Sequence, residues 1–159
     1  MNKNLSHLNE KELLQLHVAI INELKARKIV RTKNNPIGDY TEWLVAKALN
    51  LKLASNSASG YDGVDENGMK YQIKGRRITP ENKSRQLSAI RKLNDKDFDY
   101  LVGVIFDQDF AIIDAVVIPH GVVVEYSAYK DHVNAHILHL RGAILEDSRV
   151  RSIREIISS

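Results

Sequence analysis

The sequence predicts a layered α/β or α+β fold. Two segments with helical periodicity come first, a hairpin pattern and two further apolar strands follow, and helical patterns return near the C-terminus. Helices on both sides of a central block of strands are typical of domains in which helices cover a mixed or antiparallel sheet. With 159 residues the chain is long enough for a substantial core, and we expect a single domain over residues 1–159.

Residues 9–28 predict the first helix. Asn9 and Glu12 have the spacing of a capping box, in which each side chain satisfies a backbone N–H group at the helix start. The apolar residues that follow recur at helical intervals, so we expect one stripe to face the core: Leu13, Leu16, His17, Ile20, Ile21 and Leu24. On this stripe His17 is expected to be a packed side chain and not a ligand.

A second helix is predicted over Pro36–Leu49, since proline is tolerated in the first turn of a helix. Its expected buried stripe is Ile37, Tyr40, Leu44, Val45 and Ala48. Glu42 lies beside that stripe. A carboxylate at the edge of an apolar face is costly unless it is paired or binds a cation, although a glutamate on a solvated helix surface is also common.

The stretch Tyr61–Arg77 is typical of a β-hairpin. Its turn is expected at residues 66–68, Glu-Asn-Gly, because asparagine and glycine tolerate the positive φ angles of a tight reversal. Residues 50–59, which lead into the hairpin, are mostly small and polar and predict a loop.

Side chains in the second arm of the hairpin alternate between two faces. Gln72 and Lys74 should share one face, and Tyr71 and Ile73 the other. Since Asp62 lies near the start of the first arm, an acid, an amide and a lysine are expected to converge at one end of the hairpin. Core packing does not require that combination.

The remaining chain predicts a helix over 84–93 and two strands. Leu87, Ile90 and Leu93 should turn inward from the helix. The strand over 98–106 is apolar on both faces toward its end, and residues 110–118 should return beside it as a hairpin partner.

The C-terminal third predicts short elements. We expect a short helix over 120–129, an extended segment over 136–140, and a final helix capped by Asp147. The inward side chains of that last helix should be Val150, Ile153, Ile156 and Ile157.

Charge is distributed unevenly along the chain. The net charge is +3, but residues 70–96 contain nine basic and two acidic side chains, a local charge of +7 that leaves −4 elsewhere. A basic segment on a nearly neutral body suits a polyanionic partner, and a solvated, salt-tolerant surface would have the same composition.

Composition also excludes several classes of protein. The chain contains no cysteine, which excludes disulfides and thiolate metal sites, so we expect an intracellular, cytoplasmic protein. Apolar runs of about 18 residues are absent, and the N-terminus lacks the apolar core of a signal peptide, so no membrane association is expected.

Four residues, taken in order, carry a family resemblance. A helix with Glu42, a hairpin with Asp62, and a strand with Gln72 and Lys74 resemble the PD-(D/E)XK nuclease superfamily, in a variant with glutamine at the (D/E) position. The resemblance implies a restriction endonuclease-like fold, a three-layer α/β/α core in which helices flank a central mixed sheet. It covers about residues 36–106, with the helix over 9–28 and the C-terminal helices as elaborations.

The resemblance also implies roles for these residues around Mg²⁺ or Mn²⁺. Asp62 would be the bridging carboxylate, and the Gln72 amide oxygen and the Ile73 backbone carbonyl would complete the protein ligands. Glu42 would bind directly, through water, or at a second metal. Lys74 would orient the attacking water or stabilise charge in the transition state.

Gln72 is the departure from the family, which more often has Asp or Glu at this position. An amide oxygen can bind Mg²⁺, but one negative charge is lost. Metal affinity should therefore fall unless Glu42 supplies the second carboxylate.

The basic segment would then bind the nucleic-acid backbone, because contacts with phosphate groups give affinity for nucleic acid without recognising its base sequence. The expected nucleic-acid-binding residues are Lys70, Arg76, Arg77, Lys83, Arg85 and Arg91. Tyr61, Tyr71 and the arginine pair are the nearest candidates for contacts with bases.

The sequence thus predicts a metal-dependent endonuclease acting on nucleic acid, with double-stranded DNA as the expected substrate. Two alternatives stay open: a non-catalytic nucleic-acid-binding member of the same fold, and a domain whose basic face binds an acidic protein. The residues do not distinguish DNA from RNA, or a monomer from a homodimer.

Overall fold

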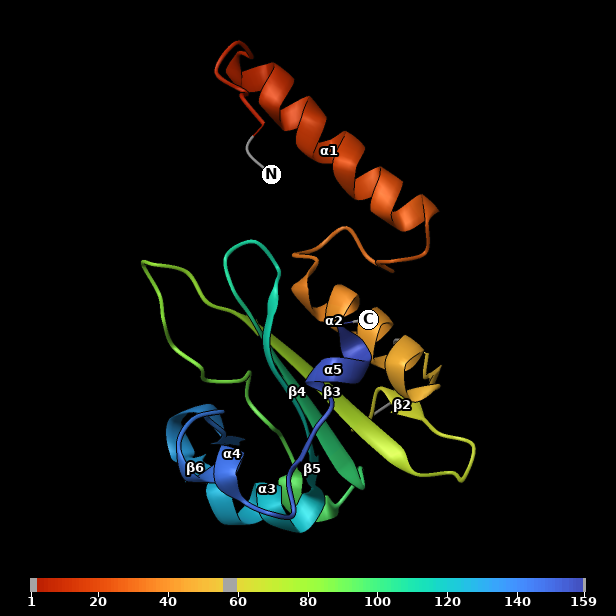
Figure 1. Ribbon diagram of the computed structural model, residues 1–159, viewed down its shortest axis with the longest axis vertical. Coiled ribbons are helices and arrows are strands. Elements are labelled where there is room, and N and C mark those ends of the chain that lie inside the picture. Colours follow the sequence, from red (N-terminus) through yellow and green to blue (C-terminus); the bar gives the residue numbers. More distant parts are fainter. Residues whose placement is uncertain (1–2, 56–59, 159) are drawn as a thin grey trace.

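The computed structural model describes residues 3–55 and 60–158, and within these ranges the chain forms a mixed α/β structure with a six-stranded sheet and five α-helices (Figure 1). In spatial order the strands of the sheet are β1 (Lys52–Leu53), β2 (Gly63–Val64), β3 (Lys70–Arg77), β4 (Tyr100–Phe106), β5 (Ile112–Pro119) and β8 (Arg151–Ser152). The helices are α1 (Glu10–Ala26), α2 (Ile37–Leu49), α3 (His120–Tyr126), α4 (Ala143–Glu146) and α5 (Arg154–Ile157). A separate ribbon pairs β6 (Ala128–Lys130) with β7 (Ala135–Ile137).

The sheet is mixed, as predicted. β3 and β4 run parallel, in register from Tyr71 opposite Tyr100 to Arg77 opposite Phe106, and the other neighbouring strands of the sheet are antiparallel. The predicted two-faced burial of the 98–106 strand is confirmed, because β4 is buried from Leu101 through Phe106. A strand buried on both faces requires a layer on each side of the sheet.

Helices supply those two layers. On one face α2 and α5 pack over the sheet, with Val45 and Ile157 in a shared apolar cluster with Val104. On the other face α3 and α4 join the segment between β3 and β4 in a second cluster that contains Leu87 and Ile144. The sheet therefore has helices on both faces.

The predicted second helix is confirmed, and it lies very close to β3. A Cβ atom built on Gly75 would lie 2.1 Å from Thr41 Oγ1, which is too short for any real contact. Thr41 is fully buried and donates its hydroxyl to the Ile37 carbonyl, 2.6 Å away. Glycine at position 75 is thus what allows α2 to approach the sheet.

The predicted helix over 84–93 is wrong. This segment is extended and bridges residues 136–139, with Gln86 opposite His139 and Ile90 opposite His136. Leu87 and Ile90 are nevertheless buried, as expected. The three-residue spacing of apolar side chains favours a helix, but pairing with a distant segment outweighs this weak local preference.

The predicted final helix is also wrong in extent. Asp147 follows α4, and its side chain accepts hydrogen bonds from the backbone and guanidinium of Arg149. The chain then pairs with β5 as β8, and only afterwards forms the one-turn helix α5. Ile153 and Ile157 are buried as predicted, but Ile156 is 48% exposed.

The first helix forms with its predicted capping box, but its apolar stripe does not face the core. Figure 1 shows α1 extending away from the sheet and its covering helices. Of the predicted stripe Ile21 is buried, but Leu13 and Ile20 are 39% and 50% exposed, and His17, expected to be packed, is exposed as well. A periodic pattern shows which face is apolar and does not show what covers it.

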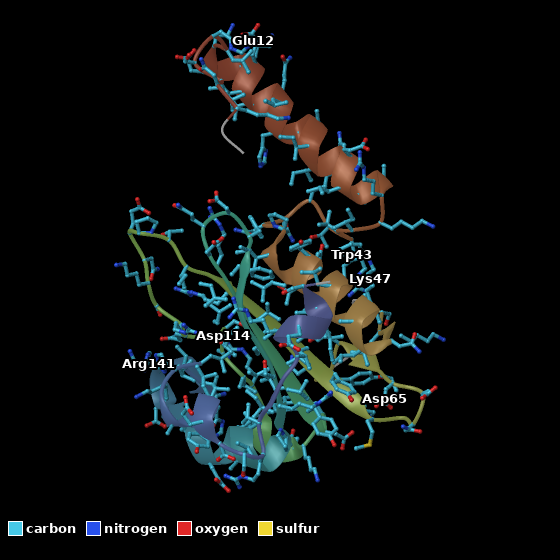
Figure 2. All side chains as sticks on the ribbon, in the orientation of Figure 1. Glu12, Trp43, Lys47, Asp65, Asp114 and Arg141 are labelled. Carbon is cyan, nitrogen blue, oxygen red and sulfur yellow. The ribbon has the colours of Figure 1, made fainter. Side chains whose placement is uncertain are left out.

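The hairpin forms at the predicted place with a modified turn. Asp65 accepts bonds from the backbone N–H groups of Asn67 and Met69, and only Gly68 of the predicted turn residues has a positive φ, +79°. Figure 2 labels Asp65 at this turn. The predicted loop over 50–59 is wrong at residues 52–53, which form β1, and its residues 56–59 lie outside the described ranges.

No helix in the described part of the chain is both long enough and apolar enough to cross a lipid bilayer.

Candidate active site

The Asp62 side chain, just before β2 begins, continues the hydrogen-bond ladder along the edge of β3. β2 pairs with Lys70 and Tyr71, and the Asp62 backbone N–H donates to the Tyr71 carbonyl at 2.7 Å. Beyond that point Asp62 Oδ2 accepts the Ile73 backbone N–H at 2.7 Å. The carboxylate is thereby fixed at the edge of β3 by its own strand geometry.

The Ile73 carbonyl faces the same edge. Peptide groups two residues apart in a strand point to the same side, and the Tyr71 carbonyl already bonds Asp62 on that side. The Gln72 side-chain amide is close enough to lower the pKa of the Asp62 carboxyl. Three of the predicted ligands therefore lie at one edge of β3.

Glu42 reaches the site from α2 and is held by an arginine. Arg31 Nη2 donates to Glu42 Oε2 at 2.6 Å, and Arg31 Nη1 donates to the Ala54 carbonyl at 2.8 Å. The side chains are only 32% and 17% exposed, respectively. Asp39 in turn accepts the backbone N–H groups of Arg31 and Thr32, which anchors the link between α1 and α2.

Lys74 lies on the face of β3 that meets the segment between β3 and β4. Its Nζ donates to Ser88 Oγ at 2.8 Å and to the Ala89 carbonyl at 3.3 Å. Its charge also interacts with Asp62. The predicted division of faces is confirmed, because Tyr71 and Ile73 pack into the cluster under α2.

Burial shifts the ionisation of three of these groups toward their neutral forms. It raises the pKa of Glu42 even though the Arg31 guanidinium opposes the shift, and the nearby Asp62 charge adds to it. Burial also raises the pKa of Asp62 against the Ile73 N–H bond and the Lys74 charge. For Lys74 burial lowers the pKa, and Asp62 opposes that shift. Asp62 interacts with both of the other groups, and a cluster of desolvated ionisable groups is typical of functional sites.

The donor set fits a hard divalent cation. Two carboxylates, an amide oxygen and a backbone carbonyl are the oxygen ligands that Mg²⁺ and Mn²⁺ accept. Mutual repulsion of Glu42 and Asp62 contributes to the raised pKa of Glu42, and a bound cation would relieve it. The described residues contain no cluster of three or more His, Cys, Asp or Glu side chains suited to a metal, so such a site relies on Gln72 and a carbonyl for its remaining ligands.

The predicted nucleic-acid-binding residues fall into three groups. Arg76 and Arg77 line a groove of about 510 Å³ at the end of β3, together with Asn35, Gly38, Thr79 and Asn82. Lys70, Lys83 and Arg91 are exposed, and Lys70 Nζ lies 4.8 Å from the centre of the Tyr61 ring. Arg85 is different, because it pairs with Asp114 of β5 (labelled in Figure 2) and donates to the Leu140 carbonyl.

Tyr71 is not accessible for stacking on a base. It is 8% exposed, its ring lies 5.3 Å from that of Tyr100, and its hydroxyl donates to Asp65. Tyr61 is partly exposed and remains a candidate for such a contact.

Sequence reasoning missed Arg31 and Ser88. Arg31 is one of several basic residues in the link between the first two helices, and its sequence context does not distinguish it from them. Ser88 lies in the predicted helix over 84–93, but its hydroxyl contacts Lys74 from an extended segment. For neither residue do the neighbouring residues in the sequence indicate its distant hydrogen-bond partner.

Neither a protein-family model nor any curated protein matches this sequence significantly.

Proposed function

We propose that this protein is a Mg²⁺- or Mn²⁺-dependent nuclease with a restriction endonuclease-like fold that hydrolyses phosphodiester bonds in double-stranded DNA. The observation that carries the proposal is the convergence of Asp62, Gln72 and Lys74 at one edge of β3, with Glu42 delivered beside them by α2. Packing alone does not require two carboxylates and a lysine to be desolvated together.

The order and direction of the strands support this fold assignment. A helix carrying Glu42 precedes three antiparallel strands, and β4 then joins β3 in parallel. One feature departs from the expected family pattern. The crossover between β3 and β4 is mostly extended with a short 3₁₀ turn at Leu93–Asp95, where the family would have a helix.

The residues of the site have distinct roles in this proposal. A divalent cation would supply an activated water and neutralise charge on the phosphate oxygens. Asp62, Gln72 and the Ile73 carbonyl would hold it, and the Ile73 N–H bond would fix the orientation of Asp62. Lys74, held by Ser88, would donate a hydrogen bond to the attacking water or to a phosphate oxygen.

The groove beside Arg76 and Arg77 is the proposed path of the nucleic-acid backbone. These two residues follow Lys74 on the same strand, so a backbone held there would lead toward the site. Arg85 is expected to contribute less than the other basic residues, since Asp114 neutralises its charge. Phosphate contacts of this kind make binding fall steeply with salt.

The test is metal-dependent nicking of supercoiled plasmid DNA. We expect nicking with Mg²⁺ or Mn²⁺ by the wild-type protein, and its loss in Asp62→Ala and Lys74→Ala. Lys11→Ala is the matched control, because Lys11 is an exposed lysine on α1 and its removal should leave nicking unchanged. Cleavage that survives both site variants would refute the assignment.

A second candidate is a nucleic-acid-binding protein of the same fold that does not cut. The ion pair between Arg31 and Glu42 favours it, because this pair engages one of the two carboxylates of the site. DNA binding by pure wild-type protein, without cleavage in either metal, would support this second function over the first.

A further inference from the structure

The exposed apolar face of α1 is the largest feature that the proposed nuclease function does not explain. Leu13, Leu14, Val18 and Ile20 are 39–68% exposed on a helix that extends from the body of the protein (Figure 1). Exposed apolar surface of this extent on one helix is typical of an interaction site.

The face continues into an apolar groove. The C-terminal half of α1 and the body enclose about 370 Å³ between them, lined chiefly by Ile20, Ile21, Leu24, Val30, Tyr40 and Phe110. The groove is therefore open to a helix that runs along α1, and it offers contacts on α1 and on the body at once.

The charges of α1 indicate which helix would fit. Glu10 and Glu12 lie in the first turn, Lys25 lies in the last turn, and Lys28 follows the helix end. Glu10 lies three residues before Leu13 and four before Leu14. Lys25 lies four residues after Ile21. Since residues at these spacings are neighbours on a helix surface, both charged side chains lie next to the apolar face. An antiparallel copy of α1 would present its acidic end to these basic residues.

We propose that the protein forms a two-fold symmetric homodimer through antiparallel pairing of its α1 helices. With the axis near His17 and Val18, Leu14 of each copy enters the apolar groove that Ile21 of the second copy lines. Glu10 of each copy then faces Lys25 of the other, and the N-terminal half of α1 fills the apolar groove of its neighbour. A self-complementary patch of this kind is what a two-fold interface requires.

The number of residues on α1 indicates that the dimer interface must also include the apolar groove. A stable interface uses about 20–30 residues on each side. α1 has only 17 residues, so helix pairing alone would be small. Residues of the groove that belong to the body, such as Val30, Tyr40 and Phe110, bring the surface toward the required size. The proposal does not depend on the nuclease site.

The first test is the molar mass of the full chain by sedimentation equilibrium. We expect a dimer for the wild type and a monomer for Leu14→Asp/Val18→Asp, whose exposed positions leave folding intact by circular dichroism. The control is Ala19→Asp/Ala26→Asp, which adds the same charge at exposed positions on the opposite side of α1 and should stay dimeric. A monomeric wild type at tens of micromolar, about the range of weak specific association, would overturn the proposal. So would a dimer that survives the Leu14→Asp/Val18→Asp change.

The second test concerns the antiparallel orientation. Glu10→Lys and Lys25→Glu should each weaken the dimer by about tenfold or more, and the double exchange should restore it. Since the chain has no cysteine, His17→Cys also offers a single thiol near the axis, and it should cross-link far faster than Gln15→Cys on the opposite side. Failure of the double exchange to restore association, or equal cross-linking at both positions, would overturn this geometry. Plasmid nicking in the same samples reports separately on the nuclease site.

Discussion

Arg31 Nη2 donates to Glu42 Oε2 at 2.6 Å, and this ion pair ties the link before α2 to the helix that carries the site carboxylate. The same guanidinium also bonds the Ala54 carbonyl, which lies just after β1. Arg31 thus joins three segments at the margin of the candidate site. Because both side chains are largely buried, the loss of one partner leaves a desolvated charge behind.

The first prediction concerns the stability of this pair. Arg31→Met should lower the free energy of unfolding by about 1–3 kcal/mol, less than for a fully buried pair because both side chains keep some exposure. Urea unfolding at pH 7 measures the loss. Much of it should return in Arg31→Met/Glu42→Gln, where no unpaired carboxylate remains.

Arg27→Met is the matched control for Arg31. Arg27 pairs with Glu23 on the surface of α1, with side chains 66% and 59% exposed, so its replacement should cost at most about 1 kcal/mol. An equal loss in both variants would mean that burial of the Arg31 pair has no energetic consequence.

The second prediction is a pH dependence caused by Asp62. Burial raises its pKa above the ordinary value of 3.8, so the folded state binds more protons than the unfolded state between that value and the raised pKa. Stability contributed by this group therefore falls as pH rises through that window. Asp62→Asn removes the effect, and without divalent cation its stability relative to the wild type should increase from pH 3 to pH 7, about the range of carboxylate titration.

Asp147→Asn provides a control of opposite sign. Hydrogen bonds from Arg149 hold the pKa of Asp147 well below its usual range, so its stabilising effect is present at neutral pH and is lost as pH falls. Its asparagine variant should therefore lose stability relative to the wild type as pH rises. Urea titrations at several pH values measure both trends, and the same trend in both variants would contradict the prediction.

The third prediction concerns the close approach of α2 to β3. Gly75→Ala should cost about 1–3 kcal/mol, because the added Cβ would lie 2.1 Å from Thr41 Oγ1. Thr41→Ala in the same chain should recover part of that loss by removing the hydroxyl. Thermal and urea unfolding measure both variants.

Gly38→Ala is the control for Gly75. A Cβ at Gly38 would have no neighbour within 4 Å among the described atoms, and alanine is the better helix former, so a gain of about 0.5–1 kcal/mol is expected. If Gly75→Ala is as well tolerated as Gly38→Ala, the helix is not held against the strand at this point.

The fourth prediction addresses the charge of the metal site. Gln72→Glu should bind Mn²⁺ about tenfold more tightly, since it restores a negative ligand where the family usually has one. Isothermal titration calorimetry measures the affinity, and Gln15→Glu on exposed α1 controls for the change in net charge. Equal Mn²⁺ affinity in the wild type and both variants would remove Gln72 from the ligand set.

The local elements of the fold were largely predictable. The capping box at Asn9, the helix after Pro36, the alternation along β3 and the two-faced burial of β4 depend on neighbours in the sequence, and each formed as expected. The placement of the four candidate residues could be predicted in the same way, whereas their roles stay predictions. These residues lie on a helix, a hairpin and a strand whose order constrains where they meet.

The errors share a different physical cause. Residues 84–93 became extended because they pair with residues 136–139, and the chain after Asp147 forms β8 because it pairs with β5. In each case backbone partners from far along the chain outweighed a weak local preference. The periodicity of apolar residues within a segment does not indicate which distant segment it will pair with.

The sequence by itself determined which side chains are apolar, where most helices and strands begin, and which four polar residues could form a site. Only the tertiary structure decided what those side chains meet. It joined Glu42 to Arg31, Lys74 to Ser88 and Asp62 to the Ile73 N–H group, and it left the apolar face of α1 exposed. The reason is that burial and ion pairing depend on surfaces brought together from distant segments, whereas periodicity and capping act within a few residues.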